Sequence, residues 1–319
     1  MRALAFQIFQ WLTGKEQYGF EPSLPAAINR FFKEAVTGKG FESGEALSQA
    51  IEIAQSDSAA QQSIAYRLGC CTDLGLERTL NEDSLFTIEF NRVNQSISIP
   101  LGVYAVADGM GGHEFGEVAS SVASKTLGDY VVQKLYSPLF NPNSTIPPNE
   151  SIQEIIENGI KQAQNAVMQK APGGGTTITA GLILGDQITI GHVGDSRLYF
   201  IYPDGRIEAK TNDHSLVRRL VDLGQITESE AKNHPNKNVL YRALGQSEPF
   251  RPDLMNLTIP KPGYILICSD GLWGSVGDEE IFRLATNSEN PSISCSKMVE
   301  AANKAGGPDN ISVILIKIL

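Results

Sequence analysis

VYAVADGMGGHEFGEVAS, residues 103–120, is the stretch that decides how this chain is organised. An apolar run over residues 103–107 ends at Asp108, and four of the next eight residues are glycines that lead into a segment with helical spacing. We therefore expect an acidic side chain at the exit of a buried strand. Asp-Gly is also a common turn dipeptide, so Asp108 taken alone is equally compatible with a simple turn.

Five more acidic residues stand at the ends of strand-like apolar runs. They are Glu82 and Asp83 in RTLNEDS, Asp195 in HVGDSR, Asp270 in CSDGLWG and Asp309 in GGPDNIS. Any one of these carboxylates could simply be solvated or cap a helix. Six carboxylates gathered at strand ends would, however, repel one another unless a cation lay between them. Because no Cys or His cluster accompanies them, the oxygen ligands suit Mg²⁺ or Mn²⁺ better than zinc or copper.

Carboxylates shared between two such ions, about 4 Å apart, form an arrangement that places a metal-bound water for in-line attack on a phosphoryl group. Arg78, five residues before Asp83, is then placed to hold the substrate phosphate by a bidentate contact. A salt bridge to a neighbouring acid is an equally good interpretation of Arg78. Gly109 matters because its carbonyl can approach a metal closely where no side chain intervenes.

The composition narrows the class of protein. The 319 residues, 41% hydrophobic and 19% charged, suffice for one large domain or two ordinary ones. The net charge of -10 argues against nucleic acid as the main partner. The four cysteines, two of them adjacent as Cys70-Cys71, offer neither a disulfide framework nor metal-ligand spacing, so we expect a reducing, cytoplasmic setting. No run approaches the ~20 apolar residues of a membrane span, and no transmembrane segment is expected.

The pattern along the chain predicts two domains with a boundary near Ser63. Residues 1–62 form an N-terminal extension of unknown function with helical spacing, and residues 63–319 form the main domain. Short β-rich runs come first in that domain, and long helices are inserted between groups of strands, which predicts layers of helix packed on sheet. The predicted helices include residues 114–136, a second helix from residue 152, and residues 281–285 and 293–303. Residues 213–245 are polar and helix-prone, and look like an excursion from the sheet.

Seven motifs, in order, resemble the metal-dependent protein serine/threonine phosphatases of type 2C in their bacterial form. They are RTLNEDS, VADGMGGHEFGEVAS, GGGTTITA, HVGDSRLY, the segment from TNDHSLV to YRALG, ICSDGLWG and GGPDNISVILI. The likeness runs from about residue 67 to residue 318. It implies an α+β fold, a four-layer α/β/β/α sandwich in which two central antiparallel sheets are flanked by helices. A two-metal site would lie at one edge, beside a mobile helical flap corresponding to residues 213–245.

The resemblance also implies roles for the acidic set. Asp108 would bridge both metals and Gly109 would supply its carbonyl oxygen. Asp270 and Asp309 would complete the coordination of one ion, while Glu82 or Asp83 would bind the other ion through a water molecule. Asp195 resembles the acid that, with the residue matching Asp270, holds a third and weaker metal. Arg78 resembles the phosphate-binding arginine.

Two positions depart from the eukaryotic pattern. Met110 stands where many eukaryotic members have a His proposed as general acid, which leaves His113 as the nearest candidate for the proton donor. A hydrogen bond that fixes the glycine loop is the competing interpretation of His113. Gly274 stands where some eukaryotic members carry a further acid for the third metal, so that site should be weaker here. Thr177 is expected to start a strand, and Trp273 to belong to the core rather than to a substrate platform.

The function predicted is hydrolysis of phosphoserine and phosphothreonine by a hydroxide bridging two Mn²⁺ or Mg²⁺ ions, with no covalent phosphoenzyme. The alternatives are a catalytically weak regulatory module that binds phosphoproteins, and a phosphatase for small phosphate esters. Phosphorylated proteins are the expected partners, among them a cognate Ser/Thr kinase or its substrates. Three roles stay open for the N-terminal extension: docking on the domain, binding a partner, or lying on a membrane surface through Phe6, Ile8, Phe9 and Trp11.

Overall fold

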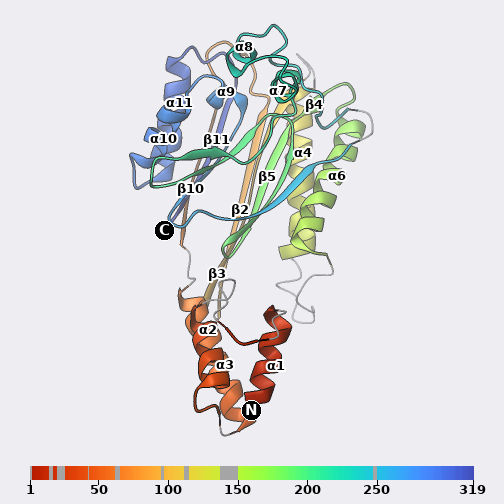
Figure 1. Ribbon diagram of the computed structural model, residues 1–319. Helices are drawn as coiled ribbons and strands as arrows, with labels where there is room; N and C mark the ends of the chain where they lie inside the picture. Colours follow the sequence, from red (N-terminus) through yellow and green to blue (C-terminus); the bar gives the residue numbers. More distant parts are fainter. Residues whose placement is uncertain are drawn as a thin grey trace. The chain divides into compact units, whose positions relative to one another are not determined.

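The computed structural model of the protein is shown in Figure 1. The structure describes residues 2–13, 17–19, 26–41, 43–61, 65–94, 97–110, 115–136, 150–246 and 250–319, and for residues 11–13, 26–27, 55–61, 91–94 and 97–100 it describes the backbone only. The chain divides into two compact units. Unit 1 comprises Met1–Ile64 and Asn91–Ile99, and unit 2 comprises Ala65–Phe90 and Pro100–Leu319. The boundary predicted near Ser63 falls within residues 62–64, outside the described residues.

Unit 1 contains helices with a hydrophobic core of their own. They are α1 (Arg2–Thr13), α2 (Ala26–Phe32), the π-helix η1 (Lys33–Thr37) and α3 (Gly44–Gln61). Phe9 and Phe32 are buried in that core and their rings meet edge to face, with centroids 5.4 Å apart. Because Phe9 is fully buried, it cannot serve the membrane contact considered for the extension. The side chain of Trp11 lies outside the described residues.

Unit 2 is built on two antiparallel sheets, as the resemblance predicts. One sheet has the order β1-β11-β10-β7-β8, and the other has the order β2-β3-β5-β6-β9 with the short β4 paired to β3. The strands of the first sheet are β1 (Tyr66–Asp73), β7 (Arg197–Ile201), β8 (Ile207–Ala209), β10 (Gly263–Cys268) and β11 (Ile311–Ile318). Those of the second are β2 (Asp83–Asn94), β3 (Ile97–Met110), β4 (Gly175–Thr176), β5 (Ile178–Leu184), β6 (Gln187–Val193) and β9 (Asp253–Thr258).

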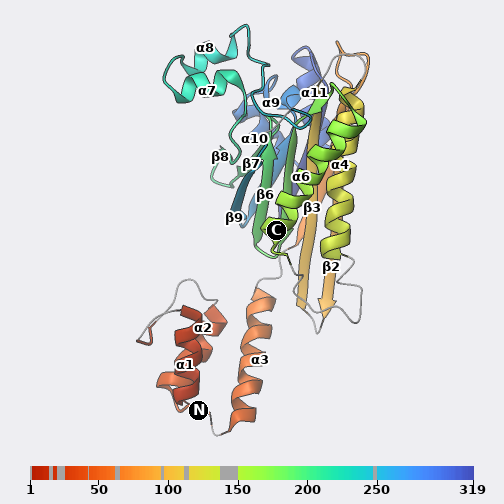
Figure 2. The ribbon, with the colours of Figure 1, turned by 90° about the vertical axis from the view of Figure 1, so that its right-hand side faces the viewer.

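Helices cover the outer face of each sheet (Figures 1 and 2). α4 (Gly116–Val131), continued by the π-helix η2 (Val132–Tyr136), packs beside α6 (Ile152–Lys170), and both contact the second sheet. α11 (Pro291–Lys304) packs on β1 and β11 of the first sheet, next to α10 (Asp278–Thr286). The continuous apolar runs of β3 and β11 are explained by this layering, because strands between two layers are buried on both faces. The predicted four-layer α+β sandwich is thus confirmed.

The second sheet corrects one local expectation. Asp108 and Gly109 are neither a turn nor the end of a strand, since β3 continues to Met110. The short strand β4 causes this extension, because Gly109 pairs with Thr176 and Met110 pairs with Gly175. A partner strand far along the chain has therefore overridden the turn preference of Asp-Gly.

Two short helices and the loops around them occupy residues 213–245. They are α7 (Leu216–Asp222) and α8 (Glu228–Lys232), each started by a side-chain cap, from Ser215 and Thr227 respectively. β-bridges pair Ser215 with Leu240 and Thr176 with Leu244, so the two ends of the segment lie side by side and its last residues rejoin the sheet at β4. Within the described residues, no helix is both long and apolar enough to cross a membrane.

Candidate active site

A cavity of about 210 Å³ lies at the edge of the sandwich where β3, β10 and β11 meet the loops. Its lining residues are Arg78, Glu82, Asp108, Gly109, Met110, Thr177, Asp195, Asn238, Leu240, Asp270 and Asp309. The cavity therefore brings together seven of the predicted site residues, namely Arg78, Glu82, Asp108, Gly109, Asp195, Asp270 and Asp309. Asp83 lies beside this set but does not line the cavity, and His113 lies outside the described residues.

The main chain of Asp108 and Gly109 is fixed from both sides. Asp108 N donates to Thr177 Oγ1 at 2.9 Å, and its carbonyl accepts from Thr177 N at 2.8 Å. Gly109 N donates to the carbonyl of Glu82 at 3.1 Å. A Cβ built on Gly109 would lie 2.2 Å from the Gly116 carbonyl oxygen, so only glycine allows α4 to start this close to the strand.

Thr177 does not start a strand as predicted, since it lies between β4 and β5, and its side chain has a further role in the site. Besides binding Asp108, its hydroxyl lies 2.8 Å from the Ser196 hydroxyl, in the loop that carries Asp195. The Thr177 side chain therefore joins the part of β3 that carries Asp108 to the loop that carries Asp195. The signal in the sequence was weak, because a threonine after glycines is common at the start of a strand.

Asn310 holds the loop of Arg78 against the sheet. Its side-chain nitrogen donates to the carbonyls of Leu74 at 2.9 Å and Leu80 at 3.0 Å, and its oxygen accepts from Glu82 N at 2.8 Å. The side chain is buried and all three bonds reach main-chain atoms. Sequence reasoning missed Asn310, although its place directly after Asp309 was visible in GGPDNIS.

Arg78 reaches the carboxylates from the solvent side. Its Nη2 donates to Asp309 Oδ2 at 2.7 Å, and Nη1 lies 3.9 Å from Glu82 Oε2. The Arg78 side chain is 44% exposed, so its guanidinium is also open to a group entering the cavity. The ion pair considered as the alternative for Arg78 is thus present, and it lies within the candidate site.

The carboxylates of the site oppose one another's ionisation. Burial raises the pKa of Asp108 well above its ordinary value, and the nearby charges of Asp83 and Asp270 raise it further. Burial, opposed by hydrogen bonds from serine hydroxyls, raises the pKa of Asp83 to about 7. Burial, followed by repulsion from Asp309, raises the pKa of Asp270 to about 6. Burial is also the main cause that raises the pKa of Asp195.

The donor atoms fit divalent cations that prefer oxygen. Oδ1 of Asp83 and Oδ1 of Asp270 are buried and have no hydrogen-bond partner among the described residues. Buried carboxylate oxygens without donors, in a group that repels itself, are suited to a shared cation. In that same part of the chain, no three His, Cys, Asp or Glu side chains are grouped tightly enough to hold one ion as they stand. The fit is therefore one of donor chemistry and shared location.

Residues 213–245 supply one wall of the cavity. Asn238 and Leu240 line it opposite the acidic loops, and sequence reasoning named neither. Leu240 belongs to the bridge with Ser215 that closes the base of this segment. Only the tertiary fold brings these residues to the cavity, because nothing in their local sequence points to a ligand.

Comparisons with known proteins agree with this geometry. The family model described as Protein phosphatase 2C matches residues 77–301. The serine/threonine phosphatase stp of Listeria welshimeri is 33% identical over 252 residues, which cover 77% of this chain and 93% of that protein. The crystal structure of the serine/threonine phosphatase PstP/Ppp of Mycobacterium tuberculosis has a TM-score of 0.65 and 31% identity, covering 79% of this chain and 98% of that one.

A second solved structure bears on the metals. The catalytic domain of the serine threonine protein phosphatase PstP in complex with 2 manganese ions has a TM-score of 0.64 and 29% identity, covering 81% of this chain and all of that one. The fold, the ordered motifs and the matches along most of the chain agree with one another. The chain therefore belongs to the protein phosphatase 2C family of metal-dependent serine/threonine protein phosphatases.

Proposed function

We propose that this chain hydrolyses phosphoserine and phosphothreonine esters of proteins in the cavity described above. The observation that carries this proposal is that the exposed guanidinium of Arg78 meets an acidic floor in one cavity. This floor consists of the lining carboxylates of Glu82, Asp108, Asp195, Asp270 and Asp309. A phosphate dianion can dock on the guanidinium, while the acidic floor suits cations that would neutralise the phosphoryl group.

The residue roles are those that the family resemblance implies, and of these residues all but Asp83 line the cavity. Asp108, the Gly109 carbonyl, Asp270 and Asp309 would hold two Mn²⁺ or Mg²⁺ ions, and Glu82 or Asp83 would act on one of them through water. Asp195, which lines the cavity together with Asp270, would hold a weaker third ion with it. When bound, the ions supply Lewis-acid stabilisation of the phosphoryl oxygens and lower the pKa of a nearby water.

The protein's own groups orient the ester. Arg78 binds the phosphate by its fork of donors and places phosphorus over the acidic floor. Asn238 and Leu240 close the cavity on the side of residues 213–245 and so bear on which peptide enters. Water attacks phosphorus, the serine or threonine oxygen leaves with a proton, and inorganic phosphate is released. His113 is the candidate donor of that proton.

The experiment starts from chelated, full-length protein. Adding Mn²⁺ or Mg²⁺ should switch on hydrolysis of an aryl phosphate and of phosphopeptides, and Asp108→Asn should reduce turnover by on the order of 10³-fold. Titrating each metal by calorimetry measures the number of ions and the preferred metal. Protein that binds Mn²⁺ weakly or not at all and hydrolyses no ester would support the regulatory module instead.

The substrate class needs its own comparison. A phosphopeptide panel should be turned over faster than free phosphorylated metabolites, because Asn238 and Leu240 of residues 213–245 form a wall of the cavity that a peptide can contact. We further propose that the physiological substrates are the targets of a Ser/Thr kinase in the cytoplasm, a reducing compartment that suits four free cysteines. Faster turnover of metabolites would favour the small-ester phosphatase.

We also propose that the helical N-terminal extension, residues 1–62, is a separate unit that binds a partner. Its buried aromatic core gives it a packed structure of its own. Deleting residues 1–62 should leave the turnover of aryl phosphate unchanged and should alter turnover only for substrates that the extension recruits. Loss of aryl phosphate turnover together with loss of solubility would instead indicate that the extension is needed for folding.

A further inference from the structure

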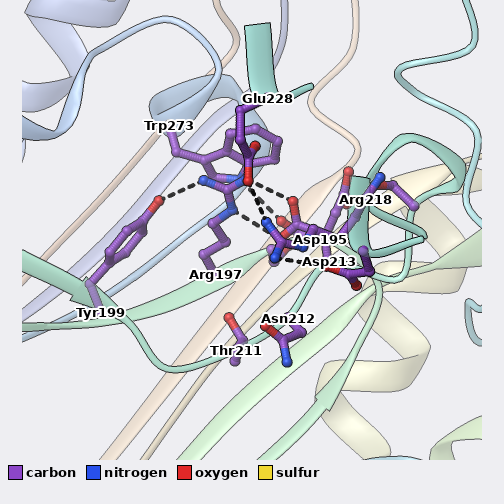
Figure 3. Close-up of polar contacts among 12 residues, drawn as sticks. Asp195, Arg197, Tyr199, Thr211, Asn212, Asp213, Arg218, Glu228 and Trp273 are labelled. Atoms are coloured by element: carbon purple, nitrogen blue, oxygen red, sulfur yellow. Dashed lines mark hydrogen bonds and ion pairs between the residues drawn. The ribbon is translucent and has the colours of Figure 1, made fainter. Parts of the chain in front are cut away.

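Arg197 connects the loop of Asp195 to the base of the flap, residues 213–245 (Figure 3). It begins β7, and its guanidinium binds Asp213 through two hydrogen bonds. Nε donates to Oδ1 at 2.9 Å and Nη2 donates to Oδ2 at 2.7 Å. Nη1 donates to the Tyr199 hydroxyl at 3.0 Å. The Asp213 side chain is only 8% exposed, so this paired fork is a rigid connection.

Trp273 adds the second half of the connection. The guanidinium carbon of Arg197 lies 3.6 Å from the centroid of the Trp273 ring, in a cation–π contact. The indole Nε1 donates to the main-chain carbonyl of Asp195 at 3.0 Å. Trp273 ends α9 (Asp270–Trp273), the short helix that begins with Asp270. The ring is partly buried against the core, as predicted, but it also holds the peptide of a cavity residue.

The other side of Asp195 is tied to the same point of the flap. Gly194 N donates to His214 Nδ1 at 3.0 Å, and His214 N donates to the Gly194 carbonyl at 2.7 Å. His214 directly follows Asp213 in the chain. Residues on both sides of Asp195 are therefore bound to two adjacent residues at the base of the flap.

The Asp195 carboxylate needs such support. It lies among the like charges of Asp270 and Asp213, which repel it, and Arg197 is the nearby opposite charge. A carboxylate that is pushed away by its neighbours keeps a fixed direction only when its main chain is held. Polar groups behind metal ligands commonly act in this way, by orienting the ligand rather than by touching the metal.

We propose that Arg197 and Trp273 are positioning residues that hold Asp195 in the cavity and couple it to the base of the flap. This inference rests on the proposed function, in which Asp195 is a metal ligand. It predicts that a displacement of the flap is transmitted to Asp195, because Asp213 and His214 bind both sides of its loop. Neither Arg197 nor Trp273 lines the cavity.

The test uses full-length, chelated protein titrated with Mn²⁺ by calorimetry. Trp273→Phe keeps an aromatic ring against the guanidinium and removes the N–H donor to Asp195 together with one ring of the indole. Arg197→Lys keeps the positive charge. It removes the pair of guanidinium nitrogens that bind Asp213 and the flat guanidinium face that lies on the Trp273 ring. Each variant should raise the Mn²⁺ concentration for half-saturation of the weakest sites about tenfold. In active protein, the Mn²⁺ requirement of kcat should rise while KM for aryl phosphate stays the same.

A double-mutant cycle shows whether the effect passes through Asp195. Trp273→Phe should add nothing to the Mn²⁺ titration once Asp195→Asn is present. Arg206→Lys is the matched control, since Arg206 also bridges two acids, Asp204 and Glu208, and contacts a Tyr202 ring at 4.1 Å. Arg206 does not line the cavity, and its replacement should leave the Mn²⁺ titration unchanged.

Two results would overturn the proposal. One is wild-type Mn²⁺ binding in Trp273→Phe, whether or not its melting temperature falls, and the other is an additive effect in the Asp195→Asn background. If Arg197→Lys does not fold, Trp273→Phe decides the question. The titration is independent of turnover, so a wild-type protein without phosphatase activity would refute the proposed function and still leave this inference testable.

Discussion

Replacing Gly109 by alanine should harm both the stability of the protein and its activity. The added Cβ would lie 2.2 Å from the Gly116 carbonyl oxygen, 2.5 Å from the Gly116 carbonyl carbon and 2.6 Å from the Glu82 carbonyl oxygen, where ordinary contacts begin at 3.4 Å. All three are main-chain atoms, so no side chain can rotate away and β3 must separate from α4 or from the Glu82 loop. Overpacking that side chains can absorb costs about 1–3 kcal/mol, and we expect the upper end, about 3 kcal/mol.

The same movement should displace the Gly109 carbonyl and the Asp108 side chain by roughly 1 Å, which can lower turnover about 10²-fold. Urea unfolding measures the first effect, as a midpoint lower by about 1 M at a slope of about 3 kcal/mol per M. Phosphopeptide turnover in saturating Mn²⁺, well below that midpoint, measures the second.

Gly128→Ala is the matched control for this experiment. Gly128 lies inside α4, and its Cβ would meet only ring atoms of Phe86 at 3.7 to 3.9 Å, which are ordinary contacts. Because glycine is unfavourable inside a helix, this variant should gain about 0.5–1 kcal/mol. The reasoning is refuted if Gly109→Ala unfolds within 0.5 kcal/mol of the wild type and keeps half of its turnover.

Three further predictions concern the surroundings of the cavity. Asn310→Ala should lower the free energy of unfolding by about 2–3 kcal/mol, since it leaves buried main-chain groups of the Arg78 loop unpaired; a loss below 0.5 kcal/mol in urea would contradict this. Arg78→Lys should raise KM for phosphopeptides about tenfold and leave Mn²⁺ binding unchanged, because lysine lacks the fork; equal KM values would exclude Arg78 as the phosphate ligand. His192 is fully buried, which lowers its pKa to about 3. The contribution of its neutral imidazole to the free energy of unfolding is therefore fully present above about pH 6.5 and is lost as pH falls toward 3. The free energy of unfolding, measured in urea, should therefore differ less between wild type and His192→Gln at pH 5 than at pH 7, by about 2 kcal/mol in favour of the variant. A difference that stays constant between these pH values would show that the imidazole does not titrate in this way.

Most residues of the site could be predicted because their side chains have the chemical groups that a metal or a phosphate needs. Carboxylates beside glycines at the ends of apolar runs are identifiable one by one, and their number argues for a cation even before any fold is known. The same holds for the alternation of strand groups with long helices, which follows from hydrophobic spacing. The cavity brings together Asp108, Asp195, Asp270 and Asp309, the four aspartates for which the sequence predicted metal binding by their own side chains.

Other features could not be predicted because they depend on partners distant in the chain. Asp108 and Gly109 lie within a strand rather than in a turn only because Gly175 and Thr176 pair beside them. Asn310 reaches a loop some 230 residues earlier, and Trp273 reaches the carbonyl of Asp195. A hydrogen bond to a main-chain atom does not depend on the side chain of the residue that accepts it. The local sequence therefore gives no sign of such a contact.

By itself, then, the sequence determined the order of the elements, the family and the acidic residues of the cavity, because hydrophobic period and charged side chains are local properties. Only the tertiary structure decided how those residues are held. It set Gly109 against α4, placed Arg78 on Asp309, and joined Asp195 to the flap through Arg197 and Trp273. The physical reason is that packing and hydrogen bonding depend on distance in space, and these partners become neighbours only when the two sheets and their loops come together.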